Sequence, residues 1–359
     1  MKVGCYFSGK TKLGGAERRL TRIFDALSVD EDIDVTFVLR KYENPTEVVK
    51  VYHSFSNKGN IKYHFVNDSN VELFSYVRKE RFDAVVFIGP YRAMMPFAIA
   101  GKLSGARCIW LLVNTSLSSY EFENIGQRIL FKICARIADN IDCLFPASAP
   151  IVKKHVNKPE SVSITPCAFT NLDEFKSAEK DRSFIFLSRL VKGKNVELFL
   201  DAVILIKSFL QDNGYKVIIA GDGDLKPVLE DKVKEENLGN LVFLPGYVDS
   251  REYFPQADVF MSLQNINNYP SQSLLEAIAC GCYIIATDIG DTRTIVKSQF
   301  GSLCGYDAKE IADLMVEFVN KELKDKLKIQ QEARAFAEKT FIIDRSVEHY
   351  RELLLHKES

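Results

Sequence analysis

Strand-length apolar runs alternate with helix-length amphipathic segments along almost the entire chain, and no other feature limits the possible fold as strongly. The runs lie at 3–7, 35–39, 61–66, 84–88, 108–113, 142–145 and 162–165, and then at 184–187, 217–220, 242–244, 259–263, 283–287 and 302–304. Nearly continuous Val, Ile and Phe runs separated by helices are typical of parallel sheets covered on both faces. The order predicts an α/β protein with two doubly wound parallel sheets.

A polar and charged stretch without periodicity, residues 170–182, separates the two series of elements and is the predicted linker. We therefore expect an N-terminal domain over 1–169 and a C-terminal domain over 183–341. A chain of 359 residues with 47% hydrophobic residues can build two cores. A last helix is expected at 343–355, with Val347, Tyr350, Leu353 and Leu354 on its apolar face.

Composition limits the classes of function. The net charge of −1 provides no bulk attraction for nucleic acid. The eight cysteines show no paired CxxC spacing, so a reduced cytosolic compartment fits best. Cys280 and Cys282 could form a redox or metal element, but no His or further Cys lies near them in the sequence. No run of about 18 apolar residues occurs, so we expect neither a signal peptide nor a spanning helix.

Polar and glycine-rich segments follow several predicted strands, at the edge where open parallel sheets bind ligands. Arg189 and Lys194 follow the run 184–187, and Gly221, Asp222 and Gly223 follow the run 217–220. A planar guanidinium and a compact ammonium can hold phosphate oxygens and together replace a metal ion. A pair of solvated loop cations is the plainer alternative. The segments predict a nucleotide-diphosphate pocket.

A polar turn at 269–272 leads into a helix that carries one carboxylate, Glu276, and Gly281 stops this helix before the run 283–287. The free backbone N–H groups at a helix start favour an anion. We therefore predict a phosphate site at this turn. The segment 273–276 also spells a capping box, in which Glu276 would only accept the Ser273 N–H.

These segments together resemble the retaining glycosyltransferases of family 4, which are glycosyl transferases of group 1. The resemblance covers nearly the whole chain and rests on five segments in the same order: Leu13-Gly14-Gly15-Ala16-Glu17-Arg18-Arg19, the stretch 164–175, Arg189 with Lys194, Gly221-Asp222-Gly223, and Leu274-Leu275-Glu276-Ala277. It implies the GT-B fold, in which two Rossmann-like domains face each other across a cleft. It also implies that the last helix, within 342–359, crosses back onto the N-terminal domain.

The resemblance implies that the N-terminal domain binds the acceptor and that the C-terminal domain binds a nucleotide sugar. Glu276 would accept hydrogen bonds from the ribose hydroxyls, and Arg189 and Lys194 would stabilise the leaving diphosphate. The donor-site candidates are Gly14, Gly15, Arg189, Lys194, Gly221, Asp222, Gly223, Tyr247, Gln272, Ser273, Leu274 and Glu276. For the loop at 14–15, a plain strand-to-helix turn is the alternative. Because that loop lacks the Gly-x-Gly-x-x-Gly fingerprint, a dehydrogenase is disfavoured.

Two positions depart from the family pattern. Eight residues before Glu276, where family members carry a carboxylate that faces the donor sugar, this chain has Asn268, or Asn267 if the loop differs by one residue. The segment 110–116 lacks the family's His, so Asn114 or Thr115 would make the sugar contact, with Arg18 as a further acceptor candidate. The catalytic candidates are Arg189, Lys194 and Asn268. Without a base among them, a front-face mechanism is favoured.

Two carboxylate pairs match the Asp-x-Asp pattern that other glycosyltransferases use for a divalent metal. Asp32 and Asp34 lie in an acidic run that fits a solvated turn. Asp222 and Asp224 lie in the turn that the resembling family uses without metal. We therefore expect no metal and no cofactor, with the nucleotide sugar as a substrate.

The segment 123–140 carries cations at 128, 132 and 136 beside isoleucines at 125, 129, 133 and 137. A basic row beside an apolar row can dock on anionic lipid headgroups, which would suit a lipid-linked acceptor. An ordinary solvated face over a core is the alternative.

The sequence thus predicts a cytoplasmic, retaining, metal-independent hexosyltransferase. It would move a sugar from a nucleotide-diphosphate sugar, UDP-linked by preference, to a glycan or lipid-linked acceptor in bacterial surface polysaccharide synthesis, with peripheral contact at the inner face of the membrane. The alternative is a catalytically degenerate GT-B subunit that binds a nucleotide sugar or a partner, and Asn268 is the residue that supports it. A bilobed small-ligand binding protein is disfavoured by the absent export signal and by Arg189 with Lys194.

Overall fold

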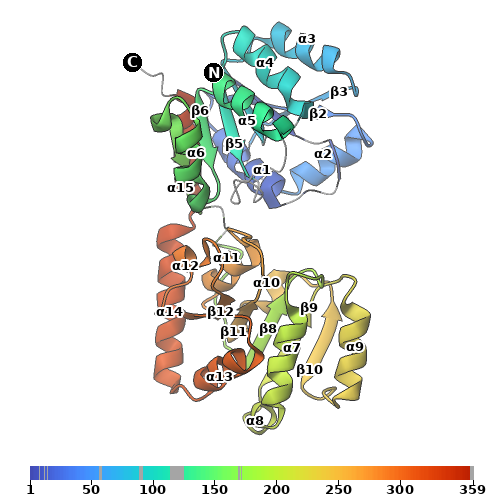
Figure 1. The fold of residues 1–359 in the computed structure, drawn as a ribbon, viewed down its shortest axis with the longest axis vertical. Helices are drawn as coiled ribbons and strands as arrows, with labels where there is room; N and C mark the ends of the chain where they lie inside the picture. Colours follow the sequence, from blue (N-terminus) through green and yellow to red (C-terminus); the bar gives the residue numbers. More distant parts are fainter. Residues whose placement is uncertain are drawn as a thin grey trace. The chain divides into compact units, whose positions relative to one another are not determined.

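The computed structural model describes residues 1–7, 9–11, 13, 15–55, 59–88, 92–113, 125–168, 170 and 172–355. The chain divides into two compact units, one made of Met1–Phe169 with Ile343–Ser359 and the other of Thr170–Ile342. Each unit is a parallel sheet with helices packed on it (Figure 1).

The first unit holds a seven-stranded sheet in the order β3-β2-β1-β4-β5-β6-β7, with all neighbours parallel. Its strands are β1 (Lys2–Phe7), β2 (Asp34–Arg40), β3 (Lys62–Val66), β4 (Ala84–Ile88), β5 (Arg107–Leu112), β6 (Asn140–Cys143) and β7 (Val162–Ile164). Its helices are α1 (Gly15–Leu27), α2 (Pro45–His53), α3 (Asn70–Glu80), α4 (Met95–Leu103), α5 (Ile125–Ile137), α6 (Ala149–His155) and α15 (Ile343–Leu355), with 3₁₀ turns η1 (Arg92–Met94), η3 (Pro146–Ser148) and η4 (Pro159–Ser161). The strand order reverses between β1 and β4, which is where doubly wound sheets bind ligands.

The second unit holds a six-stranded parallel sheet in the order β10-β9-β8-β11-β12-β13. Its strands are β8 (Ser183–Leu187), β9 (Lys216–Ala220), β10 (Val242–Gly246), β11 (Val259–Ser262), β12 (Tyr283–Thr287) and β13 (Gly301–Cys304). Its helices are α7 (Val196–Leu205), α8 (Lys207–Asp212), α9 (Lys226–Glu235), α10 (Ser250–Tyr253), α11 (Gln272–Ala279), α12 (Thr292–Ile295), α13 (Ala308–Val319) and α14 (Leu323–Thr340). Here the strand order reverses between β8 and β11.

The strands are buried because both faces of each sheet are covered. Every residue of β12 and β11 is buried, and β1 is buried from Val3 to Phe7. Continuous apolar strands of this kind are stable only under helices on both sides. The predicted fold class, two doubly wound parallel sheets, is therefore confirmed.

The last helix, α15, packs on the first unit beside α1. It buries Tyr350, Leu353 and Leu354, and the Tyr350 ring lies 5.7 Å from that of Phe24 on α1. Its His349 Nε2 lies 2.8 Å from Oδ1 of the fully buried Asp142 on β6. Apolar burial and one buried polar contact thus attach the C-terminal helix to the first sheet.

Asp142 accepts hydrogen bonds from three side chains, two at β7 and one on α15. Ser163 Oγ donates to Oδ1 at 2.7 Å and Thr165 Oγ1 donates to Oδ2 at 2.6 Å, in addition to the His349 contact. Burial raises the pKa of Asp142, but the hydrogen bonds from His349, Thr165 and Ser163 outweigh it and hold that pKa below its usual value. The carboxylate therefore joins β6, β7 and α15 in its charged form.

The stretch 170–182 lies along the second unit. The Ala178 N–H donates to Pro255 O at 3.0 Å, the Asp181 N–H donates to Gln256 O at 2.9 Å, and Lys180 Nζ donates to Cys280 O at 2.9 Å. At its start, the Thr170 N–H donates to Phe341 O at 3.2 Å. The polar residues of this stretch therefore hydrogen-bond to backbone of the second unit.

Within the described residues, no helix combines the length and apolar character needed to cross a bilayer.

Candidate donor site in the second unit

The loops after β8 and β9 interlock at the carboxyl edge of the second sheet. The Ser188 N–H donates to Ala220 O at 3.1 Å, the Leu190 N–H to Asp222 O at 2.9 Å, and the Leu225 N–H to Leu190 O at 3.0 Å. A Cβ at Gly221 would lie 1.8 Å from Ser188 O, and one at Gly223 would lie 2.4 Å from Leu190 O. Both glycines are thus needed for backbone packing, which holds the segment that carries Arg189.

Arg189 and Lys194 lie at the ends of this loop. Arg189 is exposed, and no described carboxylate pairs with its guanidinium. Lys194 is half-buried and its Nζ donates to the amide oxygen of Gln264 at 2.8 Å. Burial lowers the pKa of Lys194, and the positive charge of Arg189 lowers it further. Two cations therefore lie close together without a neutralising carboxylate among the described residues, an arrangement that attracts an anion.

A pocket opens beside Lys194 where the strand order reverses between β8 and β11. Three serine hydroxyls, one amide and one ammonium group supply its polar lining. It is lined by Phe186, Leu187, Ser188, Lys194, Phe260, Met261, Ser262, Leu263, Gln264 and Ser271. Carboxyl strand ends at a switch point are the usual ligand position in such sheets.

Helix α11 begins at this pocket. Its first residue is Gln272 and its N-cap is Ser271, whose carbonyl accepts the N–H groups of Leu274 at 3.0 Å and Leu275 at 3.2 Å. The N–H groups of Gln272 and Ser273 have no acceptor within the helix. The helix start thus offers two backbone donors, with the positive end of the helix dipole behind them.

Glu276 is 8% exposed and is held by two side chains. Ser250 Oγ donates to Oε2 at 2.9 Å, and Gln272 Nε2 donates to Oε1 at 2.9 Å. The capping-box alternative is wrong, because the box needs Ser273 as the N-cap and Ser273 lies inside the helix.

Asn267 and Asn268 have different surroundings. Asn267 Nδ2 donates to Asp291 Oδ2 at 3.1 Å, and a Cβ on Gly290 would lie 2.3 Å from Asn267 Cγ, so Asn267 supports the fold of its loop. Asn268 is half-buried, and no described residue hydrogen-bonds to its side chain. Of the two positions, Asn268 is the one whose amide is open to a ligand.

The other predicted site residues are dispersed. Tyr247 follows β10 and is 86% exposed. In the first unit Gly15 is the first residue of α1, and the guanidinium carbon of Arg18 lies 5.2 Å from the centroid of the Phe55 ring. Gly14, Asn114 and Thr115 lie outside the described residues.

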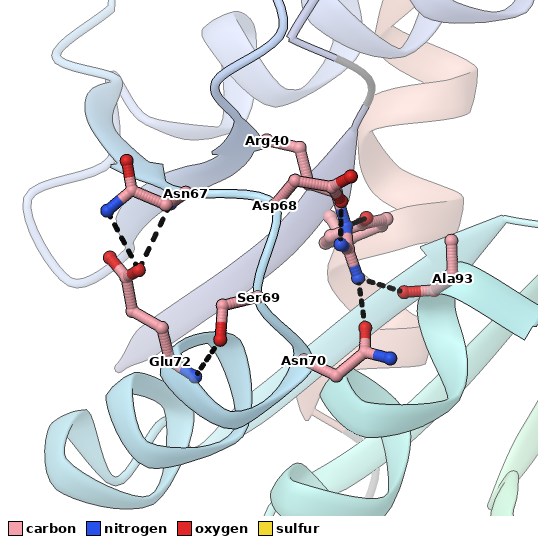
Figure 2. A network of polar contacts seen from close by, with 8 residues as sticks. Arg40, Asn67, Asp68, Ser69, Asn70, Glu72 and Ala93 are labelled. Atoms are coloured by element: carbon pink, nitrogen blue, oxygen red, sulfur yellow. Dashed lines mark hydrogen bonds and ion pairs between the residues drawn. The ribbon is translucent and has the colours of Figure 1, made fainter.

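A network centred on Arg40, which the sequence did not indicate, joins the carboxyl ends of the first sheet (Figure 2). The buried Arg40 guanidinium donates from Nε to Tyr6 Oη at 2.7 Å and from Nη2 to Ala93 O at 3.2 Å, and it also binds Asp68 and Asn70. Strands β1 and β2 and the segments that follow β3 and β4 are thereby tied together. The partners are 28 to 53 residues away in sequence, so no local motif reveals them.

A metal site would need clustered ligands, and a redox role would need reactive thiols. In the part of the chain that the structure describes, no three His, Cys, Asp or Glu residues are placed to hold a metal. Cys280 and Cys282 are both buried, and burial raises the pKa of each thiol. Cys282 Sγ lies 3.3 Å from Ala257 O, as expected of a packed thiol.

Comparison with known proteins matches this architecture. Residues 169–336 match the family model described as Glycosyl transferases group 1. The chain is 26% identical over 304 residues to the GalNAc-alpha-(1->4)-GalNAc-alpha-(1->3)-diNAcBac-PP-undecaprenol alpha-1,4-N-acetyl-D-galactosaminyltransferase of Campylobacter jejuni, covering 82% of each chain.

Two solved structures are similar in fold. Anabaena HepE in complex with UDP aligns with a TM-score of 0.80 at 16% identity, covering 99% of both chains. A mutant of S. aureus TarM, in complex with fondaparinux, alpha-GlcNAc-glycerol and UDP, aligns with a TM-score of 0.77 at 13% identity over 99% of this chain and 100% of that chain.

The two doubly wound units and these structural neighbours define the GT-B fold. The match of residues 169–336 to the glycosyl transferases group 1 model, together with the Campylobacter relative, supports a group 1 glycosyltransferase. The resemblance to glycosyl transferases of group 1 that the sequence indicated agrees with these comparisons.

Proposed function

We propose that the chain is a retaining, metal-independent hexosyltransferase that moves a sugar from a UDP-sugar to a glycan or lipid-linked acceptor in bacterial surface polysaccharide synthesis. The observation that carries the proposal is the cation pair Arg189 and Lys194 beside the pocket at the start of α11. Neither cation is neutralised by a carboxylate of the described residues, so a bound diphosphate would supply the missing charge.

The leaving group is the main charge that the site has to stabilise. When the bond between the anomeric carbon and the phosphate oxygen breaks, negative charge grows on the diphosphate. Arg189 offers a bidentate fork and Lys194 a compact charge, and α11 begins next to its N-cap Ser271, which lines the same pocket. Charge-assisted contacts of this kind contribute about 1.5–3 kcal/mol each. The three groups together fill the role that a divalent metal has in other enzymes.

Glu276 is suited to hold the nucleotide ribose. Each carboxylate oxygen already accepts one hydrogen bond, from Ser250 and from Gln272. An ionised carboxylate has about four acceptor positions, so it can accept hydrogen bonds from several donors at once, including two vicinal hydroxyls. Ser250 and Gln272 also fix the rotamer of Glu276, so the ribose would meet a pre-oriented acceptor.

Retention is proposed through a front-face displacement. Since Asn268 carries no charge, no nucleophile or base is provided at that position. The acceptor hydroxyl would therefore attack from the side on which UDP leaves. The acceptor oxygen forms a bond to the anomeric carbon, and the bond between that carbon and the phosphate oxygen breaks. The hydroxyl proton passes to the departing phosphate. Asn268 would hydrogen-bond a donor-sugar hydroxyl through its amide.

The choice of donor nucleotide and acceptor rests on the relatives. Both structural neighbours named above were crystallised with UDP, which supports a UDP-sugar donor. The Campylobacter relative is named for an undecaprenol-diphosphate-linked glycan, which supports a lipid-linked acceptor and contact with the membrane. All eight cysteines are free thiols, a state that a cytoplasmic, reducing location would maintain.

Donor protection and product analysis test the proposal. UDP, GDP and ADP and their sugars are compared by thermal shift, and the protecting UDP-sugar is then incubated with lipid-linked glycans in excess EDTA. We expect UDP-selective protection, transfer in EDTA, and a product with the anomeric configuration of the donor by NMR. Loss of transfer in EDTA with recovery on adding a divalent ion would overturn metal independence, and an inverted product would overturn the retaining mechanism.

Asn268 also favours a second candidate, a degenerate subunit that binds a nucleotide sugar without transferring it. Tight donor binding combined with neither transfer nor slow donor hydrolysis would establish that candidate. Slow release of free sugar from the donor alone would exclude it.

A further inference from the structure

We propose that α5 is a docking surface for an anionic bilayer, formed by Ile125, Ile129 and Ile133 beside Arg128, Lys132 and Arg136. The inference rests on the proposed function to the extent that a lipid-linked acceptor requires the enzyme at a membrane. Its physical basis is independent, because it comes from the exposure and charge of this helix.

The helix packs on the first sheet through its opposite side. Phe131 and Cys134 are each 1% exposed. The Phe131 ring lies edge-on to Trp110 of β5 at 5.2 Å between centroids, and Cys134 Sγ lies 3.6 Å from Met95 Sδ of α4. Figure 1 shows α5 beside α4 in the first unit. The core contact is therefore complete without the three isoleucines.

The isoleucine row faces outward. Ile125 is 75% exposed, Ile129 is 53% exposed and Ile133 is 38% exposed, whereas Ile137 packs against the core. The alternative that the whole isoleucine face covers a core is thus wrong for the first three. Exposed residues spaced by four form one continuous ridge about 12 Å long. A contiguous apolar ridge is typical of an interaction surface rather than of scattered surface residues.

The cation row lies beside this ridge. Arg128, Lys132 and Arg136 are exposed, and none of them pairs with an acidic side chain in the described ranges. The helix itself contains no acidic residue. Some exposed lysines of the first unit are neutralised by a carboxylate, as Lys62 is by Asp34 at 2.6 Å. Three unpaired cations make α5 complementary to a surface of negative charge.

The parallel rows favour a bilayer over an acidic protein. A helix lying in the membrane interface places its apolar row at the headgroup–acyl boundary and its cations at the level of the phosphates. On α5 both rows run along the helix with the same spacing of four, so a flat surface can contact them together. Anionic lipids attract each such cation over roughly a Debye length.

The experiment is co-sedimentation of the full chain with vesicles of phosphatidylcholine, alone or mixed with roughly equal parts of phosphatidylglycerol. We expect the wild type to bind the anionic vesicles and to lose binding as salt rises. Three cations near the surface should raise affinity roughly a hundredfold over neutral vesicles at low salt.

Two triple variants separate the rows. Arg128→Gln/Lys132→Gln/Arg136→Gln should remove the preference for anionic vesicles. Ile125→Ser/Ile129→Ser/Ile133→Ser should weaken binding to anionic vesicles at least tenfold, although the net charge of the protein stays the same. Two control variants change three exposed residues each on the second unit, and both should bind as the wild type does. They are Lys234→Gln/Lys309→Gln/Lys324→Gln and Leu205→Ser/Leu323→Ser/Leu327→Ser.

UDP affinity and transfer to a detergent-solubilised acceptor should be unchanged in both α5 variants, and circular dichroism checks that they are folded. A wild type that transfers sugar but does not sediment with anionic vesicles would overturn the inference and leave the proposed function intact. Binding equal to wild type in both variants would also overturn it. So would loss of a dimer in the isoleucine variant, which would assign the ridge to a second copy of the chain.

Discussion

The Nζ of Lys194 lies 2.8 Å from the amide oxygen of Gln264, a residue 70 positions further along the chain. Gln264 is 6% exposed, and its own carbonyl accepts a hydrogen bond from Thr287 Oγ1 at 2.6 Å, so its position is well determined. A neutral acceptor fixes the ammonium group without cancelling its charge. Lys194 is therefore both oriented and available to an anion.

The first prediction concerns the cation pair. Arg189→Ala and Lys194→Ala each remove a charge-assisted contact of about 1.5–3 kcal/mol, so kcat/KM should fall roughly ten- to several-hundredfold. Steady-state kinetics with the preferred donor measure the loss, and circular dichroism should be unchanged. Lys192→Ala, an exposed cation in the same loop, is the matched control and should be near wild type. Near-normal turnover in both test variants would remove the pair from the site.

The second prediction uses Gln264 variants to separate the effect of the charge of Lys194 from the effect of its position. Gln264→Glu would place a carboxylate on Lys194 Nζ and neutralise it, so UDP affinity should fall about as far as in Lys194→Ala. Gln264→Ala only releases the side chain of Lys194 and should cost less. Calorimetric titration with UDP gives both values. The same affinity in the two Gln264 variants would show that the free charge of Lys194 does not matter.

The third prediction tests Glu276 as the ribose acceptor. Glu276→Gln should weaken UDP binding roughly ten- to a hundredfold, because hydrogen bonds to a charged group are lost. For a UDP analogue without ribose hydroxyls, variant and wild type should bind alike. Ser250→Ala removes only a supporting hydrogen bond and should have a smaller effect. An equal loss for UDP and the analogue would make Glu276 a structural residue.

The fourth prediction concerns Asn268. If its amide contacts the donor sugar, Asn268→Ala should reduce discrimination between UDP-sugars while the affinity for free UDP stays the same. Competition assays with paired UDP-sugars measure the ratio. Asn267→Ala is a contrasting variant, since Asn267 supports its loop through Asp291 and should lower stability instead. A gain of activity in Asn268→Glu over an inactive wild type would favour the degenerate subunit.

The fifth prediction concerns acid stability of the first unit. The pKa of Asp142 in the folded protein is held below its usual value of about 3.9. The carboxylate therefore contributes fully to the free energy of unfolding above that usual value, and the contribution is lost as the pH falls through the lower pKa of the folded state. Asp142→Asn should cost about 3 kcal/mol at neutral pH, and the difference from wild type should shrink below about pH 4.

Trp110 makes this measurement specific, because it is the single tryptophan of the chain and is buried in the first unit. Urea unfolding followed by its fluorescence reports that unit alone. Asp34→Asn, which removes an exposed ion pair with Lys62, should change stability by less than about 1 kcal/mol at any pH. A pH-independent effect of Asp142→Asn would contradict a charged carboxylate.

Local patterns were sufficient for the fold class and for the order of the strands along the chain. Val, Ile and Phe runs separated by amphipathic helices admit few arrangements other than parallel sheets, because each run must be covered on both faces. The cations Arg189 and Lys194 and the polar start of α11 were also visible, since each follows a predicted strand directly or opens a helix.

Only the tertiary structure decided what surrounds those residues. Gln264 reaches Lys194 across 70 positions and Ser250 reaches Glu276 across 26, distances over which a single sequence carries no pairing signal. The same holds for Gly221 and Gly223, whose need for glycine comes from the carbonyls of Ser188 and Leu190 on another strand loop. On α5, periodicity placed the isoleucines on one face, but the packing of Phe131 on Trp110 decided that this face points to solvent. Periodicity determines which residues share a face, whereas contacts between distant segments determine which face is buried.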